Sequence, residues 1–505
     1  MTLHDIYLLS PEISLTGLAL IIVVLDVFIK NRVLIQSTIA LGLLVPVILS
    51  VLLWNGVGIS EELNSNNQAF GIFDTLVVDK FTLLFKFVFL GILSIVMLSS
   101  VSYAHRFEKT KIEYFSLLIF ATVGMMLLAS TRELITIYIA LELTALPMAA
   151  LIAISGNKLS SEAGIKFLIL SAISSALLLY GMVWVYGLTG TTDVAEIFQS
   201  IENINQQNTT GSTSAFGNYG LLLGLILIVA GFGFKISSVP FHMWVPDVYQ
   251  GAPTPITAFL SVASKAAGFA VILRVFYGSF SSEILSIEWS MIFAIMAVLS
   301  MAIGNFVAIA QKNMKRLLAY STIAHAGYIM MGLTVVSSRM DNFTLDGPAG
   351  VVFYLIGYAA TNLAAFVAVI AISNKTGSDS IEDFAGMGKR SPALAICLAI
   401  ALVSLTGIPP TVGFMAKLNV FTSALNGGLW WLVLAGTISS VVSAYYYFRV
   451  IKVMYLSDPL ENVRIKADPM TSIALAITVL AVVVFGFYPT PVIKAARVAV
   501  EFLMI

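Results

Sequence analysis

The sequence predicts an all-α integral membrane protein with about fourteen transmembrane helices. Of its 505 residues, 59% are hydrophobic and only 11% are charged. A soluble globular domain carries about 25% charged residues, so the composition excludes a water-soluble chain of this size. Apolar runs of roughly 20 residues, the length that spans a bilayer as a helix, recur along the whole sequence. They lack the polar–apolar alternation of barrel strands, and helices satisfy their own backbone in lipid.

Each predicted span is an apolar run bounded by charged or polar residues. The first three are 11–29, 33–54 and 77–101. Five more follow at 112–130, 132–155, 162–189, 219–248 and 254–278, and a further five at 289–310, 314–337, 348–374, 392–425 and 428–455. The last is 470–488. The polar stretch 190–218 is predicted to be a connection on the outer face.

The basic residues in the loops and at the ends of these runs orient the chain. Cytoplasmic loops of membrane proteins carry an excess of Lys and Arg. If the loop at 30–32 is cytoplasmic, that side holds sixteen basic residues and the other side four, which are Arg132, Arg339, Lys494 and Arg497. The sixteen are Lys30, Arg32, Arg106, Lys109, Lys111, Lys158, Lys312, Lys315, Arg316, Lys375, Lys389, Arg390, Arg449, Lys452, Arg464 and Lys466. Both termini are therefore expected on the non-cytoplasmic side, and an even number of spans requires that they share a side.

Sixteen and four leave seven of the twenty-seven basic residues, and all seven lie inside predicted spans. Three lie near span ends, where long side chains reach the interface: Lys80, Lys166 and Arg274. Lys86 is about two turns inside, and reaching the interface or lining a pathway are equally good interpretations. Lys235, Lys265 and Lys417 lie deeper, where a lysine costs about 2.5–3.5 kcal/mol on insertion scales. Such a cost indicates a function for these three.

Two of the deep lysines adjoin predicted helix breaks. Pro240 follows Lys235, and Pro409 and Pro410 precede Lys417. Proline removes a backbone donor and clashes with the preceding turn, and broken membrane helices surround ion sites in transporters. An ordinary kink is the alternative at each. The two broken spans are five apart, so spans 4–8 and 9–13 are predicted to be inverted repeats. The predicted division is 1–111, 112–278, 289–455 and 456–505.

Two further titratable residues lie within spans. Glu142 is predicted to pair with a buried lysine, although a helix-packing hydrogen bond is the alternative. His325 is interpreted either as a titratable link between the two repeats or as a packed histidine. The single cysteine, Cys397, and four histidines leave too few ligands for an iron–sulfur cluster or a comfortable haem site. We expect no redox cofactor and no metal in this chain, and the zero net charge suggests no nucleic-acid partner.

Three stretches resemble the antiporter-like membrane subunits of complex I, the NADH–quinone oxidoreductase. They are "KISSVPFHMWVPDVYQGAPTPITAFLSVASK", "MKRLLAYSTIAHAGY" and "GIPPTVGFMAKL", and the opening "LLSPEI" agrees. The resemblance covers essentially the whole chain and is closest to the subunit N family. Subunit M usually has a glutamate where this chain has Lys417.

The resemblance implies a proton-translocating role and assigns residues to it. Glu142 matches a glutamate that tunes a lysine, Lys235 the lysine beside the first break, and Lys265 a central proton carrier. Lys417 matches the lysine that leads to the exit, and His325 falls at a less uniform position. Flavin, iron–sulfur clusters and quinone are then expected in partner subunits. The expected partners are membrane subunits M, K, J, A and H and the lipid bilayer, in a bacterial plasma membrane.

Three other functions compete with this one. A subunit of a multi-subunit cation/proton antiporter shares the fold and is the main alternative. A self-contained transporter of a small solute predicts substrate-selective groups at the breaks, where the sequence has lysines. A structural scaffold leaves four buried charges without a role.

Overall fold

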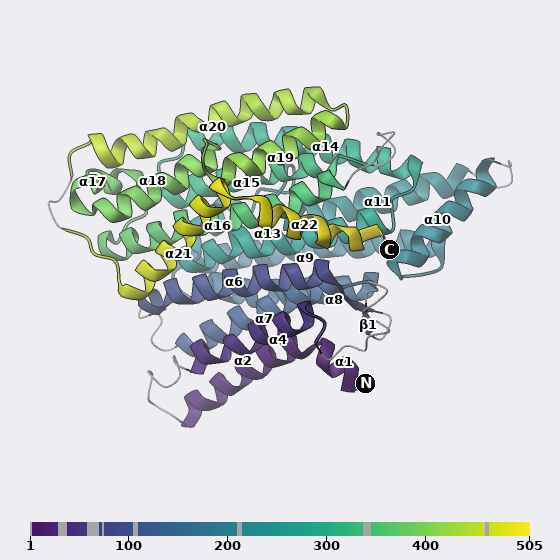
Figure 1. Cartoon of the computed structure of the whole chain (residues 1–505), viewed down its shortest axis with the longest axis horizontal. Coiled ribbons are helices and arrows are strands. Elements are labelled where there is room, and N and C mark those ends of the chain that lie inside the picture. The colour runs from purple at the N-terminus through teal and green to yellow at the C-terminus, as the bar shows by residue number, and fades with distance from the viewer. Residues whose placement is uncertain are drawn as a thin grey trace.

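A computed structural model describes residues 3–28, 38–57, 70–72, 75–104, 110–209, 215–336, 345–459 and 464–504. Five basic residues of the orientation argument lie outside these ranges: Lys30, Arg32, Arg106, Lys109 and Arg339. The described chain is a bundle of helices that run roughly side by side, with both ends of the chain at the same end of the bundle (Figure 1).

The N-terminal part contains helices α1 (Leu3–Leu8), α2 (Ser10–Phe28), α4 (Leu44–Trp54) and α6 (Lys80–Tyr103). A short antiparallel hairpin of β1 (Phe70–Ile72) and β2 (Leu76–Val78) precedes α6. Asp79 caps α6, because its carboxylate accepts a hydrogen bond from the Thr82 amide at 2.7 Å. These helices form one edge of the bundle in Figure 1.

Two sets of helices make up the rest of the core. The first is α7 (Lys111–Ser130), α8 (Leu134–Ala153), α9 (Lys158–Thr189), α11 (Ala215–Lys235), α12 (Val245–Gly251) and α13 (Thr254–Gly278). The second is α14 (Glu283–Ile309), α15 (Met314–Leu333), α16 (Asp346–Thr376), α18 (Pro392–Thr406), α19 (Val412–Asn426) and α20 (Trp430–Leu456). Two short helices, η3 (Ile381–Phe384) and α17 (Met387–Arg390), precede α18. The chain continues into α21 (Pro469–Phe487), α22 (Thr490–Val500) and η4 (Glu501–Met504).

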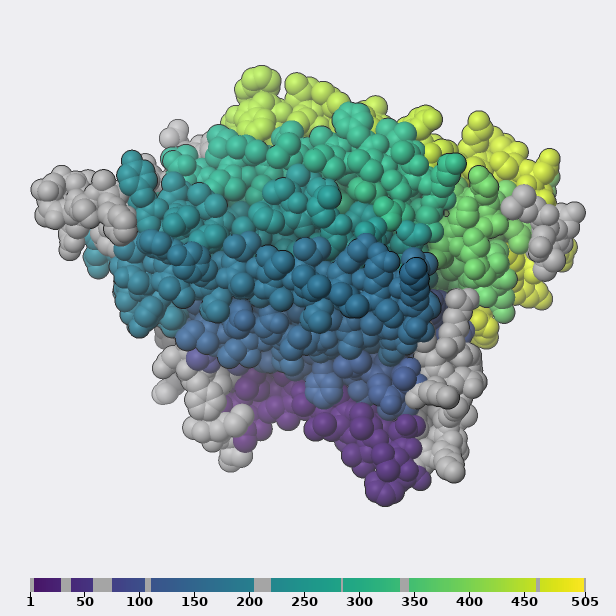
Figure 2. Space-filling view, turned by 180° about the vertical axis from the view of Figure 1, so that it is seen from behind, coloured from purple at the N-terminus to yellow at the C-terminus, as the bar shows by residue number. Residues whose placement is uncertain are grey.

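Ten helices in the described ranges are long and apolar enough to cross a membrane. The chain is therefore an integral membrane protein, as its composition predicts. Helix α13 is buried along almost its whole length, as is α16, and the two pack against each other. In the space-filling view from behind, the first set covers the middle of the face, between the N-terminal helices and the second set (Figure 2).

Both predicted helix breaks are present. Helix α11 ends at Lys235, and α12 begins only at Val245. Helix α18 ends at Thr406, and α19 begins at Val412. Helix ends leave backbone carbonyls without an intrahelical partner. Each break therefore offers carbonyl oxygens inside the bundle.

The polar stretch 190–218 contains a helix that the sequence interpretation missed. Helix α10 spans Val194–Thr209, and Val194, Ile197 and Ile201 are buried. Their spacing of three and four residues places them on one helical face. That spacing is the signal that predicts α10, although most of its other residues are polar.

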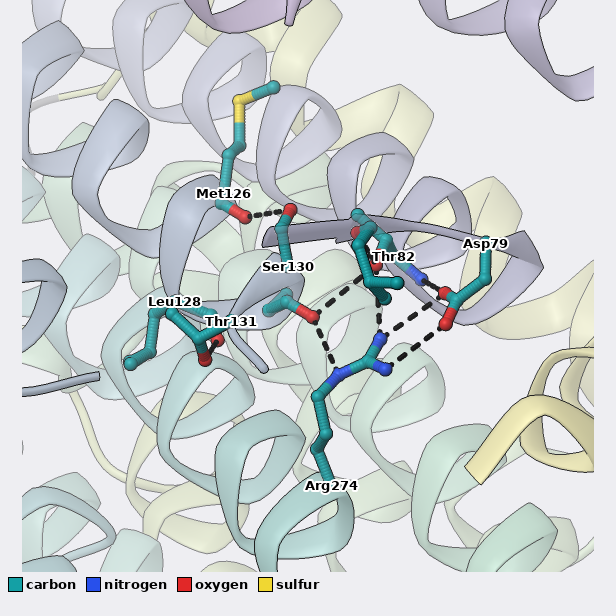
Figure 3. Close-up of polar contacts among 9 residues, drawn as sticks. Asp79, Thr82, Met126, Leu128, Ser130, Thr131 and Arg274 are labelled. Atoms are coloured by element: carbon teal, nitrogen blue, oxygen red, sulfur yellow. Dashed lines mark hydrogen bonds and ion pairs between the residues drawn. The ribbon is translucent and has the colours of Figure 1, made fainter. Parts of the chain in front are cut away.

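Arg274, which the sequence places near a span end, is buried inside the protein. It lies buried beside Asp79, with guanidinium nitrogens 3.0 and 3.2 Å from the two carboxylate oxygens (Figure 3). The guanidinium also donates to the Thr82 hydroxyl at 3.0 Å and to the Ala129 carbonyl at 3.2 Å. This pair ties α13 to α6, because the carboxylate and hydroxyl that satisfy the arginine come from the start of α6.

Asp79→Asn is expected to destabilise the protein by about 3–5 kcal/mol, because it leaves the Arg274 charge buried without its counter-ion. The measurement is thermal unfolding of the purified protein. Asp346→Asn is the control, because its partner Arg497 is largely exposed and the ion pair lies at the surface. An exposed pair contributes about 0–1 kcal/mol. Equal losses in the two variants would contradict a stabilising role for the buried pair.

Lys86 is also buried inside the protein. Its ammonium is fully buried and lies 2.8 Å from a carboxylate oxygen of Glu12 in α2, which is also buried. Glu12 lies in the first turn of α2. In the structure it is the counter-ion that allows Lys86 to remain inside the bundle.

Candidate functional site

The first break places Lys235 close to Glu142. Lys235 is the last residue of α11 and is buried, and its ammonium donates to the Ser171 hydroxyl at 3.4 Å. Glu142 lies in α8 and accepts a hydrogen bond from the Ser175 hydroxyl at 2.5 Å. Ser171 and Ser175 lie one helical turn apart on α9, and no direct ion pair joins Glu142 and Lys235 among the described residues. One helix, α9, therefore contacts both of them through its serines.

Lys265 lies in the middle of α13 with its side chain buried. Its ammonium donates to the carbonyl of Ile236 at 3.3 Å. Ile236 is the residue after Lys235, so this carbonyl belongs to the break. The break thus holds one lysine at its edge and binds a second through its backbone.

The second break is built in the same way. The Lys417 ammonium donates to the carbonyls of Leu405 at 3.2 Å and Thr406 at 2.8 Å, where α18 ends. It also donates to the Ser440 hydroxyl of α20 at 2.8 Å. Gly407 ends α18 with φ 89°, and a Cβ there would lie 2.9 Å from the Lys417 side chain. Glycine is therefore needed both for the left-handed backbone and for the approach of the lysine.

His325 lies on α15 among aromatic residues. Its Nδ1 is 2.8 Å from the Tyr354 hydroxyl, and its ring centroid is 5.6 Å from that of Tyr328. The same Tyr328 ring lies 4.6 Å from the Lys417 ammonium, in a cation–π contact. His325 is thus connected to Lys417 through Tyr328.

The structure brings the five predicted residues into two groups. Glu142, Lys235 and Lys265 gather at the first break, and His325 and Lys417 at the second. The sequence analysis missed the uncharged polar residues that position them, which are Ser171, Ser175, Tyr328, Tyr354 and Ser440. Their hydroxyls in otherwise apolar helices are a weak signal, because membrane helices use such groups for packing as well.

Asp247 lies apart from both groups, at the far end of the first break. Its carboxylate is 3.0 Å from the Lys166 ammonium and 2.8 Å from the Arg316 guanidinium, and it is partly exposed. These two ion pairs satisfy Asp247 away from the buried lysines.

A membrane bundle with two internally broken helices, each bound by a buried lysine, defines the class of antiporter-like, ion-translocating membrane proteins. Residues 131–443 match the family described as NADH:quinone oxidoreductase/Mrp antiporter, TM. The chain belongs to this family.

Individual relatives agree with the family match. The chain is 40% identical to the NADH-quinone oxidoreductase subunit N of Dehalococcoides mccartyi, over 98% of this chain and 99% of that protein. It is similar to a chain of respiratory complex I from Thermus thermophilus, with 28% identity, a TM-score of 0.76 and coverage of 96% and 98%. It also shares its fold with a chain of the Mrp complex from Dietzia sp., with 19% identity, a TM-score of 0.77 and coverage of 100% and 98%.

Proposed function

We propose that this chain is a proton-translocating membrane subunit of an NADH–quinone oxidoreductase of the complex I type. The observation that carries the proposal is the pair of broken helices whose carbonyls bind Lys265 and Lys417. A neutral lysine can accept a proton and an ammonium can release one, so buried lysines are suited to relay protons. The 40% identity to a subunit N over nearly the full length supports the complex I assignment over the antiporter.

The proposed pathway contains Glu142, Lys235, Lys265, His325 and Lys417. Glu142 and Lys235 form the first titratable pair, Lys265 carries the proton from the first break, and His325 and Lys417 lead it onward. The energy comes from quinone reduction in other subunits, which hold the flavin and the iron–sulfur clusters. The division into residues 112–278 and 289–455 as inverted repeats is part of the proposal, with a broken helix in corresponding positions of each. So are the fourteen spans.

The neighbours of the chain follow from its exposed membrane surface. Glu142 is partly exposed within a helix long and apolar enough to span the membrane. A carboxylate facing lipid is costly. We propose that neighbouring membrane subunits, of the M, K, J, A and H types, cover such positions.

The proposed orientation places Lys315 on the cytoplasmic side of a bacterial plasma membrane and both termini on the opposite side. It rests on the sixteen-to-four distribution of basic residues. Single cysteines, introduced into a Cys397→Ser background and labelled from each side, test it. Labelling of both termini from the cytoplasm would contradict the proposed orientation.

Affinity purification of the tagged chain from its native membrane tests the assignment to complex I. We expect it to bring down a peripheral arm with iron–sulfur subunits and a flavoprotein that oxidises NADH. Quinone reduction by this preparation in sealed vesicles is expected to acidify one compartment. Recovery of a complex without redox subunits, active in cation/proton exchange, would favour the antiporter.

A further inference from the structure

The contacts described so far leave a gap between the two groups of site residues. Lys265 binds the first break, and His325 reaches Lys417 through Tyr328. Nothing in those contacts connects Lys265 on α13 to His325 on α15. Helix α16 contacts both of these helices, so a connection through α16 is possible in this packing.

On the α13 side, the connection begins at Ser261. Ser261 lies four residues before Lys265, and residues four apart share a helical face. The Ser261 hydroxyl donates to the carbonyl of Ala258 at 2.8 Å and accepts a hydrogen bond from the Asn362 amide at 2.7 Å. Ser261 and Asn362 are completely buried. A polar contact therefore crosses from the face of Lys265 to α16.

On the α15 side, the connection ends at Tyr358. Tyr358 lies four residues before Asn362, on the same face of α16. Its hydroxyl donates to Thr322 at 3.0 Å, and its ring centroid is 5.1 Å from that of His325. The face of α16 that carries Asn362 thus continues to His325.

The carboxamide oxygen of Asn362 is buried and has no hydrogen-bond partner among the described residues. Buried polar atoms in folded proteins are almost always hydrogen-bonded, and ordered water satisfies those that protein groups do not reach. An asparagine has two donors and an acceptor, and only the donor side of Asn362 is bonded to protein. The acceptor side is therefore suited to a water molecule.

We propose that Asn362 is a positioning residue that joins Lys265 to His325. Its amide binds Ser261, and its oxygen holds a water molecule that extends the hydrogen-bonded connection toward Tyr358 and Thr322. The proposal rests on the proposed function, because it supplies the link between the two halves of the proton pathway. Asn362 does not change its own protonation state. It fixes the water and the hydroxyl across which the proton moves.

Asn362→Leu removes both hydrogen bonds and keeps a similar volume. Each buried hydrogen bond corresponds to roughly fivefold in an equilibrium, so coupled proton pumping by the assembled complex is expected to fall about tenfold or more. Asn419→Leu is the matched control, because the Asn419 amide donates only within its own helix, to Met415 at 2.8 Å. That control is expected to pump within about twofold of the unchanged protein, a difference smaller than one hydrogen bond.

Asn362→Ser keeps a hydroxyl and leaves room for water, so it is expected to retain much of the pumping lost in Asn362→Leu. Its rate should fall more in D2O than that of the unchanged protein, because proton transfer at this step becomes slower. A packing role predicts no change in the solvent isotope effect. If Asn362→Leu does not assemble, Asn362→Ser with its isotope effect decides the question.

Pumping by assembled Asn362→Leu at the level of the Asn419→Leu control would overturn the proposal, as would an unchanged isotope effect in Asn362→Ser. Lys265→Ala separates this failure from that of the proposed function. If Lys265→Ala abolishes pumping while both Asn362 variants pump normally, the proposed pathway is supported and the proposed role of Asn362 is wrong. Normal pumping in Lys265→Ala would remove the pathway itself.

Discussion

Glu142→Gln is expected to impair proton pumping strongly, and Glu142→Asp more mildly. Glutamine can still accept the hydrogen bond from Ser175, so this change removes the charge and little else. Aspartate keeps the charge on a side chain shorter by one methylene. Two unit charges interact by about 4 kcal/mol at 4 Å and about 2 kcal/mol at 8 Å, at an effective dielectric of 20.

The smaller of these energies applies to charges that are not in direct contact. Glu142 and Lys235 each hydrogen-bond to a different serine of α9, and no direct ion pair joins these described residues. About 2 kcal/mol corresponds to roughly thirtyfold in an equilibrium. Such an interaction is large enough to bias whether Lys235 holds its proton. It is small enough that movement of either side chain by a few ångströms changes that bias.

The measurement is proton pumping by assembled complex in sealed vesicles, with the two variants compared at equal content of the subunit. If Glu142 only packs α8 against α9, Glu142→Gln is expected to pump almost normally. Glu142→Asp would then pump less, because the shorter aspartate does not reach Ser175. Weaker pumping in Glu142→Asp than in Glu142→Gln would therefore end the electrostatic interpretation.

The fold class could be predicted from the sequence because few backbone structures satisfy all their hydrogen bonds inside a lipid bilayer. A 59% hydrophobic chain with long apolar runs is an α-helical membrane protein. The two helix breaks could also be predicted from the sequence, because Pro240 and Pro409 interrupt helices for local steric reasons. Local chemistry of this kind needs no knowledge of neighbouring helices.

The partners of buried charges could not be predicted in the same way. Arg274 near a span end looks interfacial, yet it is buried because Asp79, 195 residues away in sequence, supplies two carboxylate oxygens. Lys86 is buried for a similar reason, with Glu12 on α2. Sequence position gives the depth of a residue, and only the packing of distant helices gives its counter-ion.

The candidate lysines were visible in the sequence, and the groups that hold them were not. A lysine deep in an apolar run stands out by its cost. The carbonyls of Ile236, Leu405 and Thr406 belong to residues with no distinctive side chain in common, and they bind lysines because the helix ends there. On α16, the polar residues Tyr354, Tyr358 and Asn362 recur every four residues. This spacing is visible in the sequence, but their contacts with α13 and α15 are known only from the packing of the helices.

The central claim is that Lys265 carries the proton between the two groups of site residues. Its ammonium is buried in the middle of α13 and hydrogen-bonded to the carbonyl at the first break. Lys265→Ala removes the proposed proton carrier. Lys265→Arg keeps a positive charge and donors, but a guanidinium does not release its proton in proteins. A purely structural cation would tolerate arginine better than alanine, whereas a proton carrier tolerates neither.

The most direct test is proton pumping in sealed vesicles by assembled complex that contains Lys265→Ala. Lys494→Ala, an exposed position on α22, is the matched control. We predict that Lys265→Ala and Lys265→Arg each lose at least about 90% of coupled pumping, a tenfold effect that corresponds to only about 1.4 kcal/mol. The complex should remain assembled, and the control should pump normally. Full pumping in assembled Lys265→Ala would contradict the account.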